Sequence, residues 1–271
     1  MEPSRKTVGV NRPSENVEVS VLLPMHNEAK NIERCVAEVE RTVKSFFHSY
    51  EIIIAEDGST DGTDVIGARL AEKNPKLKFL HSPTRLGKGK AIKRAISVAR
   101  GEVVVFMDAD LATDLGCLPK IVEIVQRRGG MAIGSRYVHG ACVERPLSRK
   151  IFSAAYNLLV RILFRDGILD HQCGFKGLTY ELAQELCKKC ASDGLFLDTE
   201  MIVQAKKLGY EVAEVAVNWR ETRGKGESKV KLFKDALKIG MELLKFKLRS
   251  YIENKTKSQW RNASNGQNQV C

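Results

Sequence analysis

Short apolar runs alternate with segments of helical periodicity over the first half of the chain. Five runs have the length and the β-branched or apolar composition of buried strands: residues 17–23, 51–56, 77–81, 102–108 and 131–135. The segments between them carry apolar side chains at helical spacing, most clearly in residues 28–45, 61–73 and 87–100. Repeated strand–helix units predict an α/β fold, in which a mostly parallel sheet has helices on both faces.

The second half of the chain is less regular. Residues 149–165 predict an amphipathic helix, and residues 210–219 predict a further strand. Another amphipathic helix is expected near the C-terminus, with a broad apolar face opposite a stripe of basic residues. This pattern is typical of a helix that lies on anionic lipid, and equally of one that packs on its own domain. The expected division of the chain is a mobile tail at 1–16, one domain at 17–230, the basic helix at 231–253 and a polar tail at 254–271.

Polar or glycine-rich residues follow each of the five predicted strands. They occupy residues 24–28, 57–62, 85–90, 108–110 and 134–136. The carboxyl ends of parallel strands meet at one edge of a sheet, and ligands of such sheets bind beyond that edge. The convergence of five polar loops predicts a binding site there, and it is more specific than any one of the motifs.

The fourth loop carries two acidic residues, Asp108 and Asp110, directly after a buried strand. Two neighbouring carboxylates repel each other and raise each other's pKa. A solvated turn tolerates such a pair, but Mg²⁺ would cancel the repulsion, and it binds one or two carboxylates together with water and phosphate oxygens. The position beside four other polar loops favours the metal. For Asp57, in the second loop, a turn role and a hydrogen bond to a nucleotide are equally open.

The composition narrows the class of partner. A formal net charge of +11 implies an anionic partner, but the basic segments are nearly free of the aromatic residues that nucleic-acid binding favours. No uninterrupted apolar stretch approaches the ~20 residues of a membrane span, and the first residues lack the apolar core of a signal peptide. We therefore expect a cytosolic protein. The seven cysteines, an odd number, indicate reduced thiols, including the pair Cys187 and Cys190.

Six segments together resemble the family 2 glycosyltransferases of the GT-A fold. They are SVLLPMHNE (20–28), EDGSTDGT (56–63), RLGKGKA (85–91), DADLAT (108–113), GSRY (134–137) and R-x-x-G-x-S-K (223–229). Within that family they are similar to the polyprenyl-phosphate (dolichyl-phosphate) hexose synthases. The resemblance implies a nucleotide-diphosphate sugar as donor, Mg²⁺ or Mn²⁺ as cofactor, a lipid phosphate as acceptor and inversion at the anomeric carbon.

The resemblance also implies roles for individual residues. The nucleotide would be bound by Pro24, His26, Glu28, Ala55 and Asp57, and the donor diphosphate would be covered by Arg223 and Lys229. Asp108 and Asp110 would hold the metal and the diphosphate, with Ala109 against the donor. The acceptor phosphate would be bound by Arg136, Arg149 and Ser153. The residues expected to act in catalysis are Asp110, Arg136 and Arg223.

Three positions qualify this assignment. Lys88, in the glycine-rich loop, is expected to add positive charge to the donor site, although such a lysine also suits a solvated surface. His26 stands where the family usually has an aromatic residue. Ala112 stands where some mannose-transferring relatives have a glutamine that helps to bind the metal, so water would replace that ligand or it would be absent.

DADLAT, GKGKA and QCGFK are closer to the glucose-transferring branch, so UDP-glucose is the expected donor. GDP-mannose as donor, or a glycan hydroxyl as acceptor, are the alternatives. A hydroxyl acceptor needs a general base, for which Asp198 and Glu200 are the candidates, although ordinary helix capping is the favoured interpretation of both. A phosphate monoester needs none, because its second pKa lies near 6. A lipid acceptor implies a peripheral protein on the cytoplasmic face of a membrane, held by the anionic surface or by a membrane partner protein.

Overall fold

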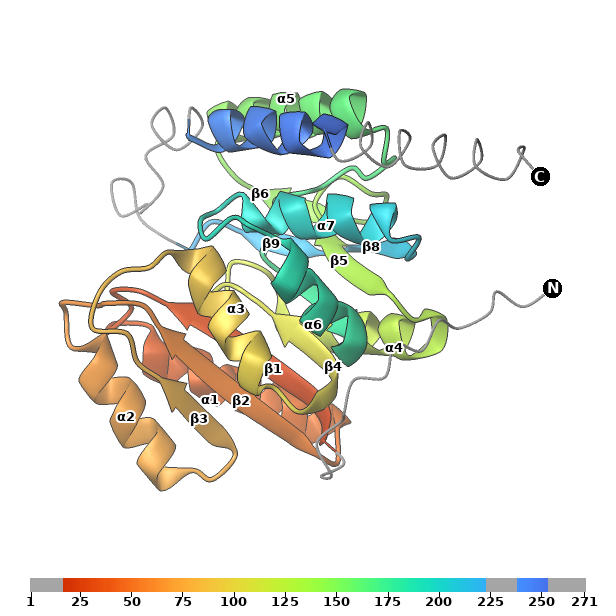
Figure 1. Ribbon diagram of the computed structural model, residues 1–271. Coiled ribbons are helices and arrows are strands. Elements are labelled where there is room, and N and C mark those ends of the chain that lie inside the picture. Colours follow the sequence, from red (N-terminus) through yellow and green to blue (C-terminus); the bar gives the residue numbers. More distant parts are fainter. Residues whose placement is uncertain (1–16, 223–237, 253–271) are drawn as a thin grey trace, which may run out of the picture. The chain divides into compact units, whose positions relative to one another are not determined.

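The computed structural model describes residues 17–222 and 238–252. The chain divides into two units, Met1–Gly226 and Glu227–Cys271, and each is described by itself. The first unit contains a seven-stranded sheet of order β3-β2-β1-β4-β7-β5-β8 (Figure 1). Its strands are β1 (Val17–Met25), β2 (Tyr50–Glu56), β3 (Leu77–Leu80), β4 (Gly101–Phe106), β5 (Met131–Ser135), β7 (Lys176–Thr179) and β8 (Val212–Ala216).

The sheet is mostly parallel, as the alternation of strand and helix patterns predicts. Only β7, among the strands of this sheet, runs antiparallel to both of its neighbours, β4 and β5. The helices of the first unit are α1 (Ile32–Phe46), α2 (Thr63–Lys73), α3 (Lys88–Val98), α4 (Leu118–Arg128), α5 (Leu147–Phe164), α6 (Tyr180–Lys189) and α7 (Leu197–Lys207), with a short 3₁₀ turn at Leu115–Cys117.

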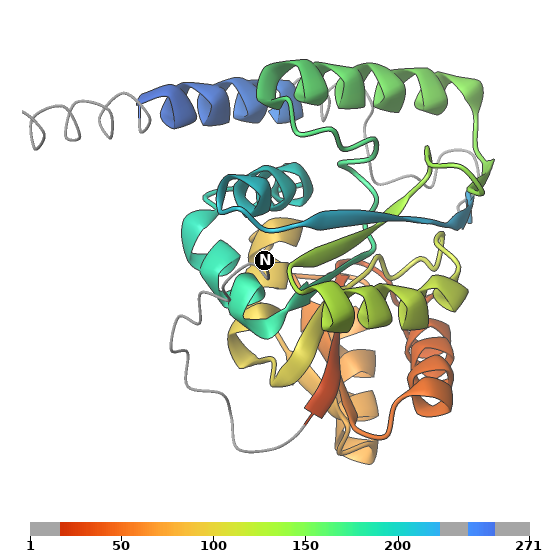
Figure 2. The same cartoon turned by 90° about the vertical axis from the view of Figure 1, so that its right-hand side faces the viewer.

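Two apolar clusters form the core, one on each face of the sheet. Successive side chains of a strand point to opposite faces, so Val21 belongs to the cluster with α1 and α4, whereas Leu22 belongs to the cluster with α3, α6 and α7. Figure 2 shows α1 and α4 to the right of the strands and α3 and α6 to the left. The prediction of helices on both faces is confirmed.

Three short strands differ from the sequence-based expectation. Residues 210–219 form two strands, β8 and β9 (Asn218–Arg220), and β9 pairs with β6 (Cys142–Glu144) in a separate two-stranded sheet. The pattern did not predict β7, which has the sequence KGLT. A lysine and a glycine in a four-residue strand give no apolar periodicity. Lys176 is buried because it pairs with Asp198, and a pattern of apolar residues does not reveal such a pair.

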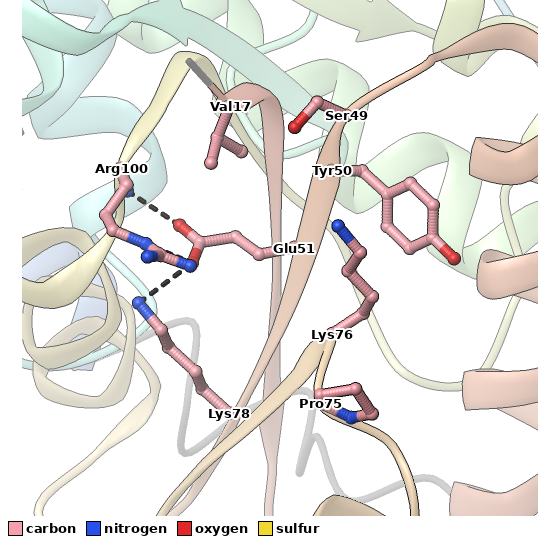
Figure 3. A pocket seen from close by; sticks show the side chains of 8 residues that line it. All are labelled: Val17, Ser49, Tyr50, Glu51, Pro75, Lys76, Lys78 and Arg100. Atoms are coloured by element: carbon pink, nitrogen blue, oxygen red, sulfur yellow. Dashed lines mark hydrogen bonds and ion pairs between the residues drawn. The ribbon is translucent and has the colours of Figure 1, made fainter. Parts of the chain in front are cut away.

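The amino ends of the parallel strands are closed by an ion cluster around Glu51. This buried carboxylate accepts hydrogen bonds from the hydroxyl of Ser20 and the backbone N–H of Arg100, both at 2.6 Å, and pairs with Lys78 at 2.8 Å. Figure 3 shows Lys78 and Arg100 directed at Glu51, beside a cavity of about 330 Å³. None of the predicted site residues in the described part of the chain lines this cavity. It lies at the end of the sheet opposite to the expected site.

The second unit is described only at residues 238–252, which are helical. The first part of the predicted basic helix, residues 231–237, lies outside the described residues, as do the tails at 1–16 and 254–271. Met241, Leu244 and Leu248 on the described part are exposed. Over the described ranges, no helix combines the length and the apolar character that crossing a bilayer requires.

Candidate active site

The loops after β1 and β2 are tied together by hydrogen bonds. The backbone N–H of Asn27 donates to the hydroxyl of Ser59 at 2.9 Å, and the Asn27 amide oxygen accepts from the N–H of Thr60 at 2.8 Å. His26 lies 2.8 Å from the carbonyl oxygen of Asp57. Asn27 has a φ of 54°, in the left-handed region that asparagine tolerates better than most residues. The hydrogen bonds join the two loops into a single polar wall.

The residues expected to bind the nucleotide lie along this wall. Pro24 and Ala55 are neighbours across the β1–β2 ladder, and Ala55 is fully buried. Glu28 is also buried, and its backbone N–H donates to the hydroxyl of Thr63 at 2.8 Å. The structure therefore brings Pro24, His26, Glu28, Ala55 and Asp57 together at the carboxyl ends of β1 and β2. Their role toward a nucleotide stays a prediction.

The carboxylate of Asp57 supports the glycine-rich loop. One oxygen accepts from the N–H of Leu86 at 2.7 Å and the other from the N–H of Gly87 at 2.9 Å. Gly87 is the residue before α3 and has a φ of 109°, a conformation that glycine adopts most readily. Asp57 thus fixes the start of α3, and with it the first residue of that helix, Lys88.

Asp108 and Asp110 lie in the loop that leaves the carboxyl end of β4. Asp108 is exposed, while Asp110 is half-buried and its carboxylate accepts from the N–H of Ala112 at 3.1 Å. Ala109 between them is buried. Among the described residues, no group of three or more His, Cys, Asp or Glu side chains is placed to hold a metal. Two carboxylates with the remaining positions open suit Mg²⁺ or Mn²⁺, which keep water and phosphate oxygens as ligands.

Gly174 makes room for the Asp108 carboxylate. A Cβ atom added at Gly174 would lie 2.0 Å from the Asp108 Oδ2 atom, a distance that real side chains do not reach. Gly174 precedes β7, the strand that the sequence pattern did not predict. The glycine of the QCGFK segment is therefore explained by the close approach of the Asp108 carboxylate, which with Asp110 would suit the implied metal.

A chain of ion pairs leads from Asp108 into the protein interior. The Lys88 ammonium lies 2.8 Å from Asp108 Oδ1 and 3.1 Å from Asp198 Oδ2. The other Asp198 oxygen lies 2.7 Å from the ammonium of Lys176, which is fully buried. Burial alone would lower the pKa of Lys88, but the charges of Asp108 and Asp198 outweigh it and raise that pKa above its ordinary value.

Asp198 lies in the first turn of α7, as a capping role would require, but its carboxylate binds the two lysines. Both of its oxygens accept from ammonium groups, so a proton on an incoming hydroxyl would compete with two charged donors. This geometry disfavours Asp198 as a general base. Lys176 was not identified from the sequence, although it stands two residues after the informative glycine of QCGFK.

Arg136 is held by a buried bidentate ion pair. Its Nε and one terminal nitrogen lie 2.7 and 2.9 Å from the two oxygens of Asp170. Burial alone would raise the pKa of Asp170, but the charge of Arg136 and its hydrogen bonds hold that pKa below its usual value. The guanidinium also lies over the Trp219 ring, 5.9 Å from its centroid. Arg136 is therefore positioned rigidly beside the other basic residues described next.

The other residues expected to bind the acceptor phosphate meet around Arg145, which sequence reasoning did not single out. Arg145 donates to the Ser153 hydroxyl at 3.2 Å and to the carbonyl oxygen of Arg149 at 3.0 Å, and it lies over the same Trp219 ring at 5.3 Å. Burial and the positive charges of Arg136 and Arg149 lower the pKa of Arg145. Its Nε atom is buried and has no hydrogen-bond partner among the described residues. Three arginines and a hydroxyl thus form one cationic cluster.

This arginine cluster adjoins the aspartate loop. Thr113, three residues after Asp110, forms a β-bridge with Trp219, and the carbonyl oxygen of Ala112 accepts from the N–H of Arg220 at 2.8 Å. Trp219 is the ring over which Arg136 and Arg145 lie. The two predicted subsites are therefore adjacent. Arg223 and Lys229 lie outside the described residues.

Residues 20–187 match the family model described as glycosyl transferase family 2. The chain is 42% identical over 234 residues to "Glycosyltransferase AglD" of Haloferax volcanii, a match that covers 84% of this chain but 37% of that protein. It is 32% identical over 251 residues to the "Dolichyl-phosphate beta-glucosyltransferase" of Dictyostelium discoideum, covering 88% of this chain and 76% of that one.

A solved structure shares the fold. The glucosyl-3-phosphoglycerate synthase of Mycobacterium tuberculosis, crystallised with Mn²⁺, UDP and glucosyl-3-phosphoglycerate, superposes with a TM-score of 0.57 at 20% identity. The match covers 80% of this chain and 79% of that one.

Proposed function

The chain belongs to glycosyl transferase family 2, and from this premise we propose that it transfers glucose from UDP-glucose to a dolichyl or related polyprenyl phosphate, with inversion at the anomeric carbon. The acceptor class and the sugar come from the dolichyl-phosphate glucosyltransferases to which the chain is similar over most of its length. The residues of the candidate site supply an independent argument for the acceptor.

The observation that carries the proposal is the arginine cluster, in which the Arg145 guanidinium contacts the Ser153 hydroxyl and the Arg149 carbonyl oxygen and lies near the charge of Arg136. Arg136, Arg145, Arg149 and the Ser153 hydroxyl are the groups that bind a phosphate well. A cationic cluster next to the aspartate loop suits an anionic acceptor better than a sugar hydroxyl.

The reaction then needs positioning more than proton transfer. A phosphate monoester is largely dianionic near neutral pH, so its oxygen attacks the anomeric carbon without a base, while the bond from that carbon to the diphosphate oxygen breaks. Arg145 and Arg149 would orient the attacking phosphate. Asp108 and Asp110 would hold a divalent ion, which when bound would offset the charge that develops on the departing diphosphate.

The lipid part of the acceptor agrees with the surface of α5. This helix carries Ser153 and Arg149, and its exposed apolar side chains are Leu147, Ile151, Phe152, Leu158, Leu159 and Ile162. An apolar helix surface bordered by basic residues is typical of peripheral membrane binding. The proposal therefore includes attachment to the cytoplasmic surface of a membrane, where a lipid phosphate is available.

A donor screen tests the proposal. Radiolabelled UDP-glucose, GDP-mannose and UDP-N-acetylglucosamine are each incubated with the purified protein, a short polyprenyl phosphate and Mn²⁺ or Mg²⁺. We expect label in the lipid fraction from UDP-glucose only, and none when the metal is chelated. Transfer from GDP-mannose would replace the sugar assignment. Transfer to the free polyprenol, but not to its phosphate, would overturn the acceptor assignment.

A further inference from the structure

Lys88 contacts two carboxylates of very different exposure. Its ammonium bridges Asp108, whose side chain is 48% exposed, and Asp198, whose side chain is 6% exposed. An ion pair at an exposed carboxylate is weak and exchanges readily with solvent ions. A pair with a buried carboxylate is costly to break, because it leaves an uncompensated charge in the interior. The two contacts of Lys88 are therefore unequal.

The buried side of this arrangement is fixed. Asp198 is held by Lys176, whose side chain is fully buried, and the Lys176 ammonium also donates to the carbonyl oxygen of Cys173. The start of α3, which carries Lys88, is fixed by Asp57 and by tight packing of Gly87, where an added Cβ would lie 2.4 Å from the carbonyl oxygen of Asp193. An exchange of partners at this site therefore requires a movement of the Lys88 side chain alone.

We propose that Lys88 is an exchangeable counter-ion of the metal site. In the metal-free protein its ammonium neutralises Asp108, and it leaves that carboxylate when the site takes up a divalent ion. Asp198 retains the ammonium beside the site, where the diphosphate of the donor becomes its new partner. This inference rests on the proposed metal-dependent donor site, and it adds an order of events that the proposed function does not contain.

The charges of five side chains support this exchange. Asp108, Asp110 and Asp198 with Lys88 and Lys176 sum to −1, so a divalent ion added alone leaves an excess of one positive charge around Lys88. A diphosphate that brings two negative charges restores the original net charge. Lys88 therefore opposes the ion when it arrives alone and favours the ion together with the nucleotide. The structure thus predicts coupled binding, in which UDP strengthens the affinity for the metal and the metal strengthens the affinity for UDP equally.

The test measures binding, without catalysis, by calorimetric titration of the full chain. Lys88→Met should raise the affinity for Mn²⁺ in the absence of nucleotide by about fivefold, because the competing charge is gone. The same variant should lower the affinity for UDP at saturating Mn²⁺ by about tenfold, because a charged donor to the diphosphate is lost. Lys120→Met, which removes one exposed positive charge from α4, is the matched control and should change neither affinity.

Asp198→Asn is a second variant, with the opposite expected effect on metal affinity, and it is compared only at a wild-type melting temperature, because it also leaves the buried Lys176 without its carboxylate. Without its anchor, the Lys88 ammonium stays on Asp108, so the affinity for Mn²⁺ alone should fall. If Lys88→Met leaves that affinity unchanged or lowers it, Lys88 is not an exchangeable counter-ion, and the proposed function still stands. If the wild-type protein binds neither Mn²⁺ nor UDP, the proposed donor site fails, and this inference fails with it.

Discussion

Gly174 determines where the carboxylate of Asp108 can lie. The residue is buried, and the space that its side chain would fill is occupied by an oxygen of Asp108. Any larger residue must push the carboxylate or shift the chain before β7. The absence of a side chain at Gly174 thus determines the position of the Asp108 carboxylate in the loop after β4.

We therefore expect Gly174→Ala to fold but to bind metal poorly. A displacement of Asp108 by about 1 Å should lower kcat by about 100-fold, and the affinity for Mn²⁺ in the presence of UDP should fall as well. Turnover and calorimetric titration measure the two effects. Gly240→Ala is the control, because an added Cβ there meets no atom within 4 Å. A variant with wild-type affinity for Mn²⁺ would show that Asp108 does not need its observed position.

Arg149 is the arginine of the cluster best suited to mutation. Removing Arg136 would leave the buried Asp170 unpaired, so its effects on folding and on binding could not be separated. Arg149 pairs with the partly exposed Glu221 at 2.5 Å.

We expect Arg149→Ala to raise KM for polyprenyl phosphate by about tenfold while the affinity for UDP stays the same. Lys150→Ala, which removes an exposed charge from the next position of α5, should leave KM unchanged. A weaker affinity for UDP in Arg149→Ala would place Arg149 in the donor subsite instead.

At the residue scale, the sequence predicted the ends of the ion-pair networks but not their interiors. Asp108 follows a predicted strand and Lys88 lies at the start of a predicted helix. Their position at one edge of the sheet could therefore be inferred from the periodicity. Lys176 and Asp170 could not, because each is defined by a partner that is distant in the sequence: Asp198 for one and Arg136 for the other. Spacing along one chain carries no signal for such pairs.

Glu51 joins elements rather than completing a site. Its carboxylate connects β2 to Ser20 on β1, to Lys78 on β3 and to Arg100 just before β4. Burial alone would raise the pKa of Glu51, but hydrogen bonds from Lys78, Ser20 and Arg100 hold it below the ordinary value of 4.5. A carboxyl group with a lowered pKa stabilises the folded state above that ordinary value, and this stabilisation is lost as the pH falls through the folded-state pKa.

We expect Glu51→Gln to lower the free energy of unfolding at pH 7 by about 2 kcal/mol. This is less than the cost of breaking a fully buried pair, because the side chains of Lys78 and Arg100 remain 33% and 32% exposed. The difference from wild type should shrink below pH 4.5, as the wild-type carboxyl becomes protonated. Urea unfolding at several pH values measures it. Glu33→Gln, at an exposed pair with Arg69, should cost less than about 0.5 kcal/mol. A cost for Glu51→Gln that does not change with pH would contradict the electrostatic explanation.

At the element scale, periodicity identified the five strands that carry the parallel half of the fold. It placed β4 slightly too long, since residues 107–108 already belong to the loop. It did not find β6 or β7, and it merged β9 with β8 into one strand; these three strands are three or four residues long and contain charged or small residues. Strands of this length are specified by their neighbours in the sheet, which a local pattern does not contain.

For the whole molecule, we expect reversible binding to membranes through α5. Purified protein should sediment with vesicles that contain anionic lipid, and the triple variant Ile151→Asp, Leu158→Asp and Ile162→Asp should stay in the supernatant, because charged side chains oppose insertion of the helix face. Val65→Asp, at an equally exposed apolar position on α2, is the control and should sediment as the wild type does. Sedimentation of the triple variant would assign membrane attachment to another part of the chain.

The position of β7 has a consequence for synthesis of the protein on the ribosome. β7 lies between β4 and β5 in the finished sheet, yet in the chain it comes after both of them and after α5. As the chain emerges, β1 to β4 can pair with one another, but the inner edge of β4 waits for residues 176–179. An unpaired strand edge is a site of aggregation, and the wait lengthens with the number of residues made in between. Any pause in translation between β5 and β7 would therefore prolong the time for which this edge of β4 has no partner strand.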